Sequence, residues 1–260
     1  MNIQFFKYQG TGNDFIIINN LSNEVSELTT KQVNFLCDRR FGIGADGLML
    51  LSKKEGYDFE MIYYNADGNE SSMCGNGGRC LVKFAQHQGI NKIDYHFIAI
   101  DGDHEAKIDN AGIVSLKMKN VDTVSAHNSH AVLNTGSPHY VKFSSNVEDL
   151  DVVEEGRHVR YSKEFITQGI NVNFVETIDD GTIYVRTYER GVENETLSCG
   201  TGVTAAALVS AHNDKGFNEV KVKTPGGSLS VEFTKIDDSH FEDIWLSGPA
   251  EFVYSGEIEI

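Results

Sequence analysis

Two stretches of the chain carry the same pattern. The first is Asn69-Glu70-Ser71-Ser72-Met73-Cys74-Gly75-Asn76-Gly77, and the second is Asn194-Glu195-Thr196-Leu197-Ser198-Cys199-Gly200-Thr201-Gly202. Both fit N-E-[ST]-x-x-C-G-x-G, and their cysteines lie 125 residues apart in a chain of 260 residues. A repeat whose offset is close to half the chain length indicates two homologous halves.

A second, shorter match supports the duplication. Thr11-Gly12 and Thr135-Gly136 are 124 residues apart, which is almost the offset of the cysteine motifs. Chance gives a two-residue match easily, but it rarely gives a nine-residue match at a compatible offset.

Each cysteine precedes a segment with the length of a helix. The sequence predicts these helices over residues 75–88 and 200–212, with strand-like segments before and after each of them. Residues 203–209 are apolar nearly all round, and a helix of that kind is buried on most sides. We therefore expect strands wrapped around a central helix, twice over, in an α+β protein.

The charge balance excludes some partners. The chain has 38 acidic and 22 basic residues, a formal net charge of -16. Nucleic-acid binding shows a basic footprint, and this chain has none. The first eight residues have no signal-peptide pattern, and no apolar run has the length of a membrane span. We expect a cytoplasmic protein with neither a nucleic-acid nor a membrane partner.

The four cysteines are Cys37, Cys74, Cys80 and Cys199. In a reducing compartment a structural disulfide is not expected, and without a Cys-x-x-Cys pair no metal site is predicted. Cys80 lies six residues after Cys74, about 240° around a helix, so it faces away from it. Cys37 lies in an amphipathic segment, where we expect it to pack in the core.

The position of Cys74 and Cys199 suggests their chemistry. The first N–H groups of a helix have no intrahelical partner, and with the helix dipole they favour an anion. A cysteine there forms its thiolate more readily, and the neighbouring N–H groups can bind a carboxylate. One such thiol would suggest a nucleophile, but inversion of a carbon needs a base on one face and an acid on the other. A matched pair therefore predicts racemisation or epimerisation.

These motifs together resemble the diaminopimelate epimerase family over the whole chain. The landmarks are Gly12-Asn13-Asp14-Phe15, Tyr64-Asn65-Ala66-Asp67-Gly68, Cys74-Gly75-Asn76-Gly77-Gly78-Arg79-Cys80, Pro138-His139, Gly169-Ile170-Asn171-Val172, Tyr188-Glu189-Arg190-Gly191 and Cys199-Gly200-Thr201-Gly202. The resemblance implies interconversion of L,L- and meso-2,6-diaminopimelate, without pyridoxal phosphate or a metal, by a homodimer.

The resemblance also implies residue roles. Cys74 and Cys199 would be the acid and base, and His139 would lie near the thiols. The implied substrate-binding residues are Asn13, Asn65, Gly75, Asn76, Asn171, Glu189, Arg190, Gly200 and Thr201.

The family fold implies two pseudo-symmetric barrels of mainly antiparallel strands, each around a central helix, with the active site in the cleft between them. On that fold the first domain would span residues 1–118 with a return strand at 250–260, and the second would span 119–249. Two departures from the family are Ser137, where Asn is usual, and Gly47, where Gln is frequent.

Alternatives remain open. A proline or hydroxyproline racemase of the same fold would also use opposed cysteines, although the Asn-rich landmarks and Glu189-Arg190 favour a substrate with two charged ends. A thiol redox protein would use Cys74 and Cys199 for reversible oxidation. A binding protein without turnover is disfavoured because both cysteines are present. The Gly-x-Gly-x-x-Gly run at 42–47 follows a helical segment and precedes a strand, which is the reverse of a dinucleotide fingerprint.

Overall fold

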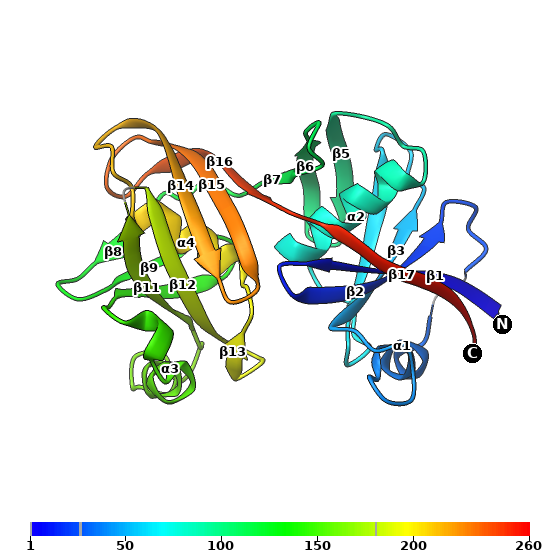
Figure 1. Cartoon of the computed structure of the whole chain (residues 1–260), viewed down its shortest axis with the longest axis horizontal. Coiled ribbons are helices and arrows are strands. Elements are labelled where there is room, and N and C mark those ends of the chain that lie inside the picture. The colour runs from blue at the N-terminus through cyan, green and yellow to red at the C-terminus, as the bar shows by residue number, and fades with distance from the viewer. Residues whose placement is uncertain (1, 26–27, 180) are drawn as a thin grey trace. The chain divides into compact units, whose positions relative to one another are not determined.

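The computed structural model describes residues 2–25, 28–179 and 181–260. It divides into two compact units. Figure 1 shows the elements of the chain, coloured continuously from the N-terminus to the C-terminus. Unit 1 comprises Met1–Leu116 and Gly248–Ile260, and unit 2 comprises Lys117–Ser247. The C-terminal segment thus belongs to the same unit as the N-terminus.

Unit 1 is built mainly of strands. They are β1 (Asn2–Gly10), β2 (Asn13–Asn20), β3 (Gly47–Ser52), β4 (Phe59–Asn65), β5 (Asp94–Ala99), β6 (Gly102–Ile108), β7 (Val114–Lys117) and β17 (Glu251–Glu259), with helices α1 (Thr30–Cys37) and α2 (Gly75–His87). The last strand, β17, pairs antiparallel with β1 from Asn2 to Gln9, so the two ends of the chain lie side by side.

Unit 2 has a similar inventory. Its elements are β8 (Val124–Ala126), β9 (Ala131–Asn134), β10 (Pro138–Phe143), η1 (Val147–Asp149), α3 (Val152–Arg160), β11 (Asn171–Asp179), β12 (Thr182–Glu189), β13 (Asn194–Thr196), α4 (Gly200–Val209), β14 (Gly216–Thr224), β15 (Gly227–Lys235) and β16 (Phe241–Gly248).

The two units share one order of strand pairings. In unit 1, β1 to β6 pair in succession as antiparallel, parallel, antiparallel, parallel and antiparallel. In unit 2 the succession β9, β10, β11, β12, β14 and β15 follows the same alternation. Even the register agrees, because Phe15 lies opposite Gly47 and His139 lies opposite Asn171, each residue 124 positions from its counterpart.

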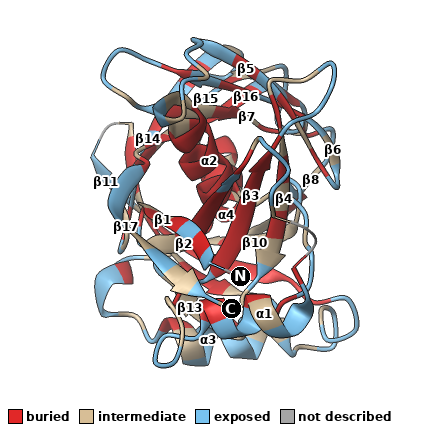
Figure 2. Cartoon of the chain, turned by 90° about the vertical axis from the view of Figure 1, so that its right-hand side faces the viewer, coloured by how far each residue is buried: buried red, intermediate tan, exposed pale blue. Residues whose placement is uncertain are grey.

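A central helix packs against the strands of each unit. Helix α2 contacts β1, β2, β3, β6 and β17, and α4 contacts β9 to β12 together with β14 and β15. Both helices are buried over most of their length, as the red ribbons in Figure 2 show. No helix among the described residues is long and apolar enough to cross a membrane.

Both central helices are shorter than predicted. Helix α4 ends at Val209 rather than residue 212, and α2 ends at His87. The physical reason in α4 is the end of its apolar run. The Ser210 hydroxyl donates to the Ala206 carbonyl, 2.7 Å away, and polar residues follow.

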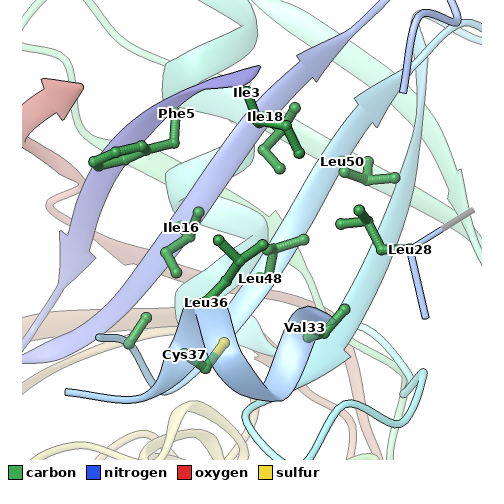
Figure 3. Packing of buried hydrophobic residues seen from close by; sticks show 11 residues of the cluster. Ile3, Phe5, Ile16, Ile18, Leu28, Val33, Leu36, Cys37, Leu48 and Leu50 are labelled. Atoms are coloured by element: carbon green, nitrogen blue, oxygen red, sulfur yellow. The ribbon is translucent and has the colours of Figure 1, made fainter. Parts of the chain in front are cut away.

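A second core in unit 1 holds helix α1 against the sheet. Val33, Leu36 and Cys37 of α1 pack against Ile16 and residues of β3, as Figure 3 shows. Thr29 starts this helix with a capping box, because its hydroxyl accepts from the Gln32 N–H and the Gln32 side chain accepts from the Thr29 N–H. Cys37 therefore has the packing role predicted for it, and burial raises its pKa to about 12.

Candidate active site

The two repeat cysteines occupy the same position in their units. Cys74 is the N-cap of α2 and Cys199 is the N-cap of α4, both with extended backbone dihedral angles. Each cysteine carbonyl accepts the first helical hydrogen bond, from Gly78 at 2.7 Å and from Val203 at 2.8 Å. The N–H groups of the first turn therefore point toward each thiol's end of the helix, where an anion is favoured.

Around Cys74 the structure brings together three residues of the predicted site. The side-chain oxygen Oδ1 of Asn13, at the start of β2, lies 3.7 Å from the Cys74 Sγ. The Asn76 Nδ2 donates to the same oxygen at 3.3 Å. Asn76 is only 2 % exposed, so its amide belongs to the floor of the site rather than to its open face.

A charged network that the sequence analysis missed holds Asn13 in place. The Asn13 Nδ2 donates to the Asp46 carboxylate at 2.6 Å. Arg39 bridges Asp46 and Asp14, and Lys7 also pairs with Asp14 at 2.7 Å. Burial raises the pKa of Asp14, but hydrogen bonds from Arg39 and Lys7 outweigh it and hold that pKa well below its usual range.

Arg79 is the second feature that the sequence analysis missed. It lies in the second turn of α2 and is fully buried. Its guanidinium donates to Asn76 Oδ1 at 3.0 Å and to Thr11 Oγ1, the Gly75 carbonyl and the Pro249 carbonyl at 3.3 to 3.4 Å. No Asp or Glu in the described part of the chain forms an ion pair with it, so neutral oxygens alone hold this buried cation behind Cys74.

Around Cys199 the surroundings are polar in a different way. The Thr201 hydroxyl lies 3.6 Å from the Cys199 Sγ and 2.9 Å from Nε2 of His139. The other ring nitrogen of His139, Nδ1, is 3.0 Å from the Asn173 side-chain nitrogen. His139 is fully buried, and burial together with the positive charge of Arg190 lowers its pKa to about 3. The imidazole is therefore neutral near pH 7.

Asn171, Ser137 and Arg190 form a third cluster, in unit 2. The Asn171 side-chain amide donates to the Ser137 hydroxyl at 2.9 Å and accepts from the backbone N–H of Arg190 at 2.9 Å. The Arg190 guanidinium donates to the Ser137 hydroxyl at 3.4 Å and to the Gln168 carbonyl at 3.0 Å. Ser137 therefore takes part in this cluster, although it departs from the family pattern.

Asn65 and Glu189 end equivalent strands, β4 and β12, and are 124 residues apart. Asn65 is exposed and Glu189 is half-buried. The second departure from the family, Gly47, lies directly opposite Asn65 in the sheet. A Cβ atom at Gly47 would lie 2.6 Å from the Tyr63 ring and 2.7 Å from the Tyr64 carbonyl. Tyr63 thus occupies the space that a side chain at position 47 would need.

The remaining cysteine of α2 is outside the site. Cys80 is fully buried, and burial raises its pKa to about 12. Its thiol is therefore unsuited to proton transfer near neutral pH.

Comparison with known proteins assigns the chain. The profile of the family described as "Diaminopimelate epimerase" matches residues 5–124 and 131–253. The chain belongs to this family. A diaminopimelate epimerase of Flavobacterium psychrophilum is 50% identical over 98% of this chain and 100% of its own length. That of Chlorobaculum tepidum is 44% identical over 96% of this chain and 99% of its own length. The prediction of an isomerase family is confirmed.

Solved structures of low identity share the fold. A phenazine biosynthesis protein of the PhzF family from Bacillus anthracis superposes with a TM-score of 0.76 at 16% identity, covering 100% of both chains. A hydroxyproline epimerase from Agrobacterium vitis gives 0.66 at 15% identity, covering 99% of this chain and 92% of its own. The predicted α+β fold with two similar strand-rich halves is confirmed.

Proposed function

We propose that this protein interconverts L,L- and meso-2,6-diaminopimelate by moving a proton at one α-carbon, with Cys74 and Cys199 as the acid–base pair. One observation carries the proposal. The two cysteines are the N-caps of two buried helices that occur in the same strand framework, so each presents a thiol beside helix N–H groups. The names of the relatives supply the substrate.

The chemistry needs both helix ends at one substrate. A thiolate on one face removes the α-proton, and the electron pair of the C–H bond moves into the carboxylate, which becomes enediolate-like. The thiol on the other face then gives its proton to the carbon, so that one thiol and one thiolate remain with their roles exchanged. N–H groups at Gly75-Asn76 and Gly200-Thr201 would bind the carboxylate and stabilise the charge that develops there.

The other predicted residues suit an amino acid with a second charged end. Arg190 is exposed and can form a two-point pair with a carboxylate. Glu189 and the amide oxygens of Asn13, Asn65 and Asn171 suit an ammonium group. Asn13 and Asn65 belong to unit 1, and Asn171, Glu189 and Arg190 belong to unit 2, so the proposed roles draw on both units. The homodimer, the cytoplasmic location and the independence from cofactors stay predictions.

Hydrogen exchange tests the proposal directly. The protein is incubated with L,L-diaminopimelate in heavy water, and the α-proton is followed by NMR together with formation of the meso isomer. We expect deuterium entry with conversion, and loss of roughly 10³-fold or more in Cys74→Ala and in Cys199→Ala. Cys80→Ala is the matched control, because it removes a buried thiol from the same helix.

Two outcomes would contradict the assignment. Absence of exchange in folded, reduced protein would exclude this substrate, and the same assay with proline and hydroxyproline would then test the racemase alternative. Full activity in either cysteine variant would exclude the two-thiol mechanism.

A further inference from the structure

The two candidate thiols face neighbours of opposite hydrogen-bonding character. Beside Cys74 lies an amide oxygen, Asn13 Oδ1, which can only accept. Beside Cys199 lies the Thr201 hydroxyl, which can donate or accept. Which of these Thr201 does can be read from the groups behind it.

In unit 2 the hydrogen-bond directions can be assigned starting from the side-chain amide of Asn173. Its side-chain nitrogen faces the Tyr140 carbonyl at 3.0 Å, and its side-chain oxygen accepts from the Thr187 hydroxyl at 2.9 Å. A carbonyl only accepts, so the amide orientation is determined by its partners. The same nitrogen therefore donates to Nδ1 of His139.

That donation sets the tautomer of the histidine. Because Nδ1 accepts, the proton of the neutral ring is on Nε2, which donates to the Thr201 oxygen 2.9 Å away. The hydroxyl hydrogen of Thr201 is then available to a second partner, and the Cys199 Sγ lies 3.6 Å from the Thr201 oxygen. The hydrogen-bonded series from Asn173 through His139 to Thr201 therefore ends in a hydroxyl that can donate to the Cys199 sulfur.

The corresponding row in unit 1 ends in an acceptor. The Asn13 amide nitrogen donates to the Asp46 carboxylate, and the Arg79 guanidinium donates to the Asn76 amide oxygen. With these orientations the Asn76 nitrogen and the Cys74 sulfur both face Asn13 Oδ1. An acceptor beside a cysteine favours the protonated thiol, whereas a donor favours the thiolate.

We propose that Thr201, oriented by His139 and Asn173, donates to Cys199 and makes it the thiolate of the resting pair, while Asn13 holds Cys74 as the thiol. The inference rests on the proposed function only for its catalytic meaning. It makes Thr201, His139 and Asn173 positioning residues for the proton-accepting cysteine.

Charges on the neighbouring elements also affect whether each cysteine is a thiol or a thiolate. Near Cys74, the Arg79 cation favours a thiolate, although its N–H groups are directed at four oxygens. The nearby Asp14 and Asp46 carboxylates are paired with Lys7 and Arg39. In unit 2, Arg190 acts on His139, and Glu189 ends β12. Glu195 of β13 is paired with Arg186 at 2.6 Å.

The test measures the protonation of each thiol separately. Unliganded protein is alkylated with iodoacetamide from pH 5 to 10, and the four cysteine-containing peptides are quantified by mass spectrometry. The midpoint pH is compared rather than the rate, because exposure changes the rate but not the midpoint. We expect the Cys199 midpoint to lie about one pH unit or more below that of Cys74.

Three variants assign the effect to the hydroxyl. Thr201→Val should raise the Cys199 midpoint by about one unit, and Thr201→Ser, which keeps the hydroxyl, should leave it nearly unchanged. Thr204→Val, on the next turn of α4, should not move it, because the Thr204 hydroxyl donates to the Gly200 carbonyl.

A Cys74 midpoint at or below that of Cys199 in the wild-type protein would overturn the proposal, and so would a Cys199 midpoint that Thr201→Val leaves in place. The comparison of the Cys74 and Cys199 midpoints uses the wild-type protein alone, so it does not depend on whether a variant folds. The readout is also separate from epimerase activity, so its failure would leave the heavy-water result standing, and the reverse holds equally.

Discussion

The side chains that lie under the cysteine helix occupy equivalent strand positions in the two units, but they are mainly apolar in unit 1 and polar in unit 2. The three equivalent pairs, each 124 residues apart, are Phe15 and His139, Met49 and Asn173, and Tyr63 and Thr187. In unit 1 the Phe15 and Tyr63 rings pack edge to face, with centroids 6.1 Å apart. In unit 2 the same three positions carry a hydrogen-bonded row.

The two helices also differ at a buried position near their starts, but there the more polar side chain is in unit 1. Position 79 of α2 is a buried arginine, and its counterpart 125 residues later, Thr204 of α4, is a buried threonine bonded to its own helix. Duplication thus preserved the strand framework and the thiol positions, while the side chains around each thiol diverged. In a two-base reaction one thiol holds a proton while the other does not, and different surroundings decide which state each thiol prefers before substrate binds.

Replacing Arg79 should give the largest change in stability. Arg79→Met removes the guanidinium donor from four oxygens, three of which belong to buried residues, and each loss at a buried oxygen costs about 1–3 kcal/mol. We expect the free energy of unfolding, measured by urea denaturation, to fall by about 3 kcal/mol or more. Thr204→Val at the equivalent position should change it by less than about 1 kcal/mol. Similar losses in the two variants would show that the asymmetry between the helices has no energetic weight.

The glycines at the third position of each helix come next. A Cβ atom at Gly202 would lie 2.3 Å from the Asn173 side-chain oxygen, whereas one at Gly77 would lie 3.2 Å from the flexible Met49 sulfur. Gly202→Ala should therefore destabilise the protein by about 2–3 kcal/mol through overpacking. Gly77→Ala should cost less than about 1 kcal/mol, because alanine gains helix propensity. Thermal unfolding of both variants provides the measurement, and an equal response would contradict a rigid polar floor in unit 2.

The smallest effect is a pH dependence carried by His139. Its pKa is lowered to about 3 in the folded protein, against about 6.5 for an unperturbed histidine. The unfolded chain therefore binds the extra proton below pH 6.5, and stability is lost as the pH falls. Between pH 7 and pH 5 this single group should remove about 2 kcal/mol.

Urea titrations at the two pH values check this figure. The free energy of unfolding should fall between pH 7 and pH 5 by about 2 kcal/mol less in His139→Gln than in the wild-type protein. This variant keeps every other titrating group. His240→Gln is the control, because His240 is exposed and Asp237 raises its pKa, the opposite direction. An unchanged difference in His139→Gln would mean that the ring is not held neutral.

Much of the candidate site could be predicted from the sequence, because its landmarks are local. A Cys-Gly-x-Gly run at a helix start is readable from neighbouring residues, and its repetition pointed to both Cys74 and Cys199. The ends of α2 and α4 were overestimated because an apolar pattern does not mark where the last helical hydrogen bond is made. Asn173 carried a weak signal, since it follows the landmark Asn171 by two residues and faces the same side of β11.

The sequence by itself determined that the chain is a duplicated α+β protein of an epimerase family with two paired helix-start cysteines. Those properties depend on short motifs and on their offset along the chain. Only the tertiary structure decided that Arg79 is buried with no Asp or Glu of the described residues paired to it, that Tyr63 fills the space beside Gly47, and that the Thr201 hydroxyl lies within reach of both Cys199 and His139. Each of these depends on strands that approach from distant parts of the chain, and the direction of a hydrogen bond is set by all the partners that such an approach brings together.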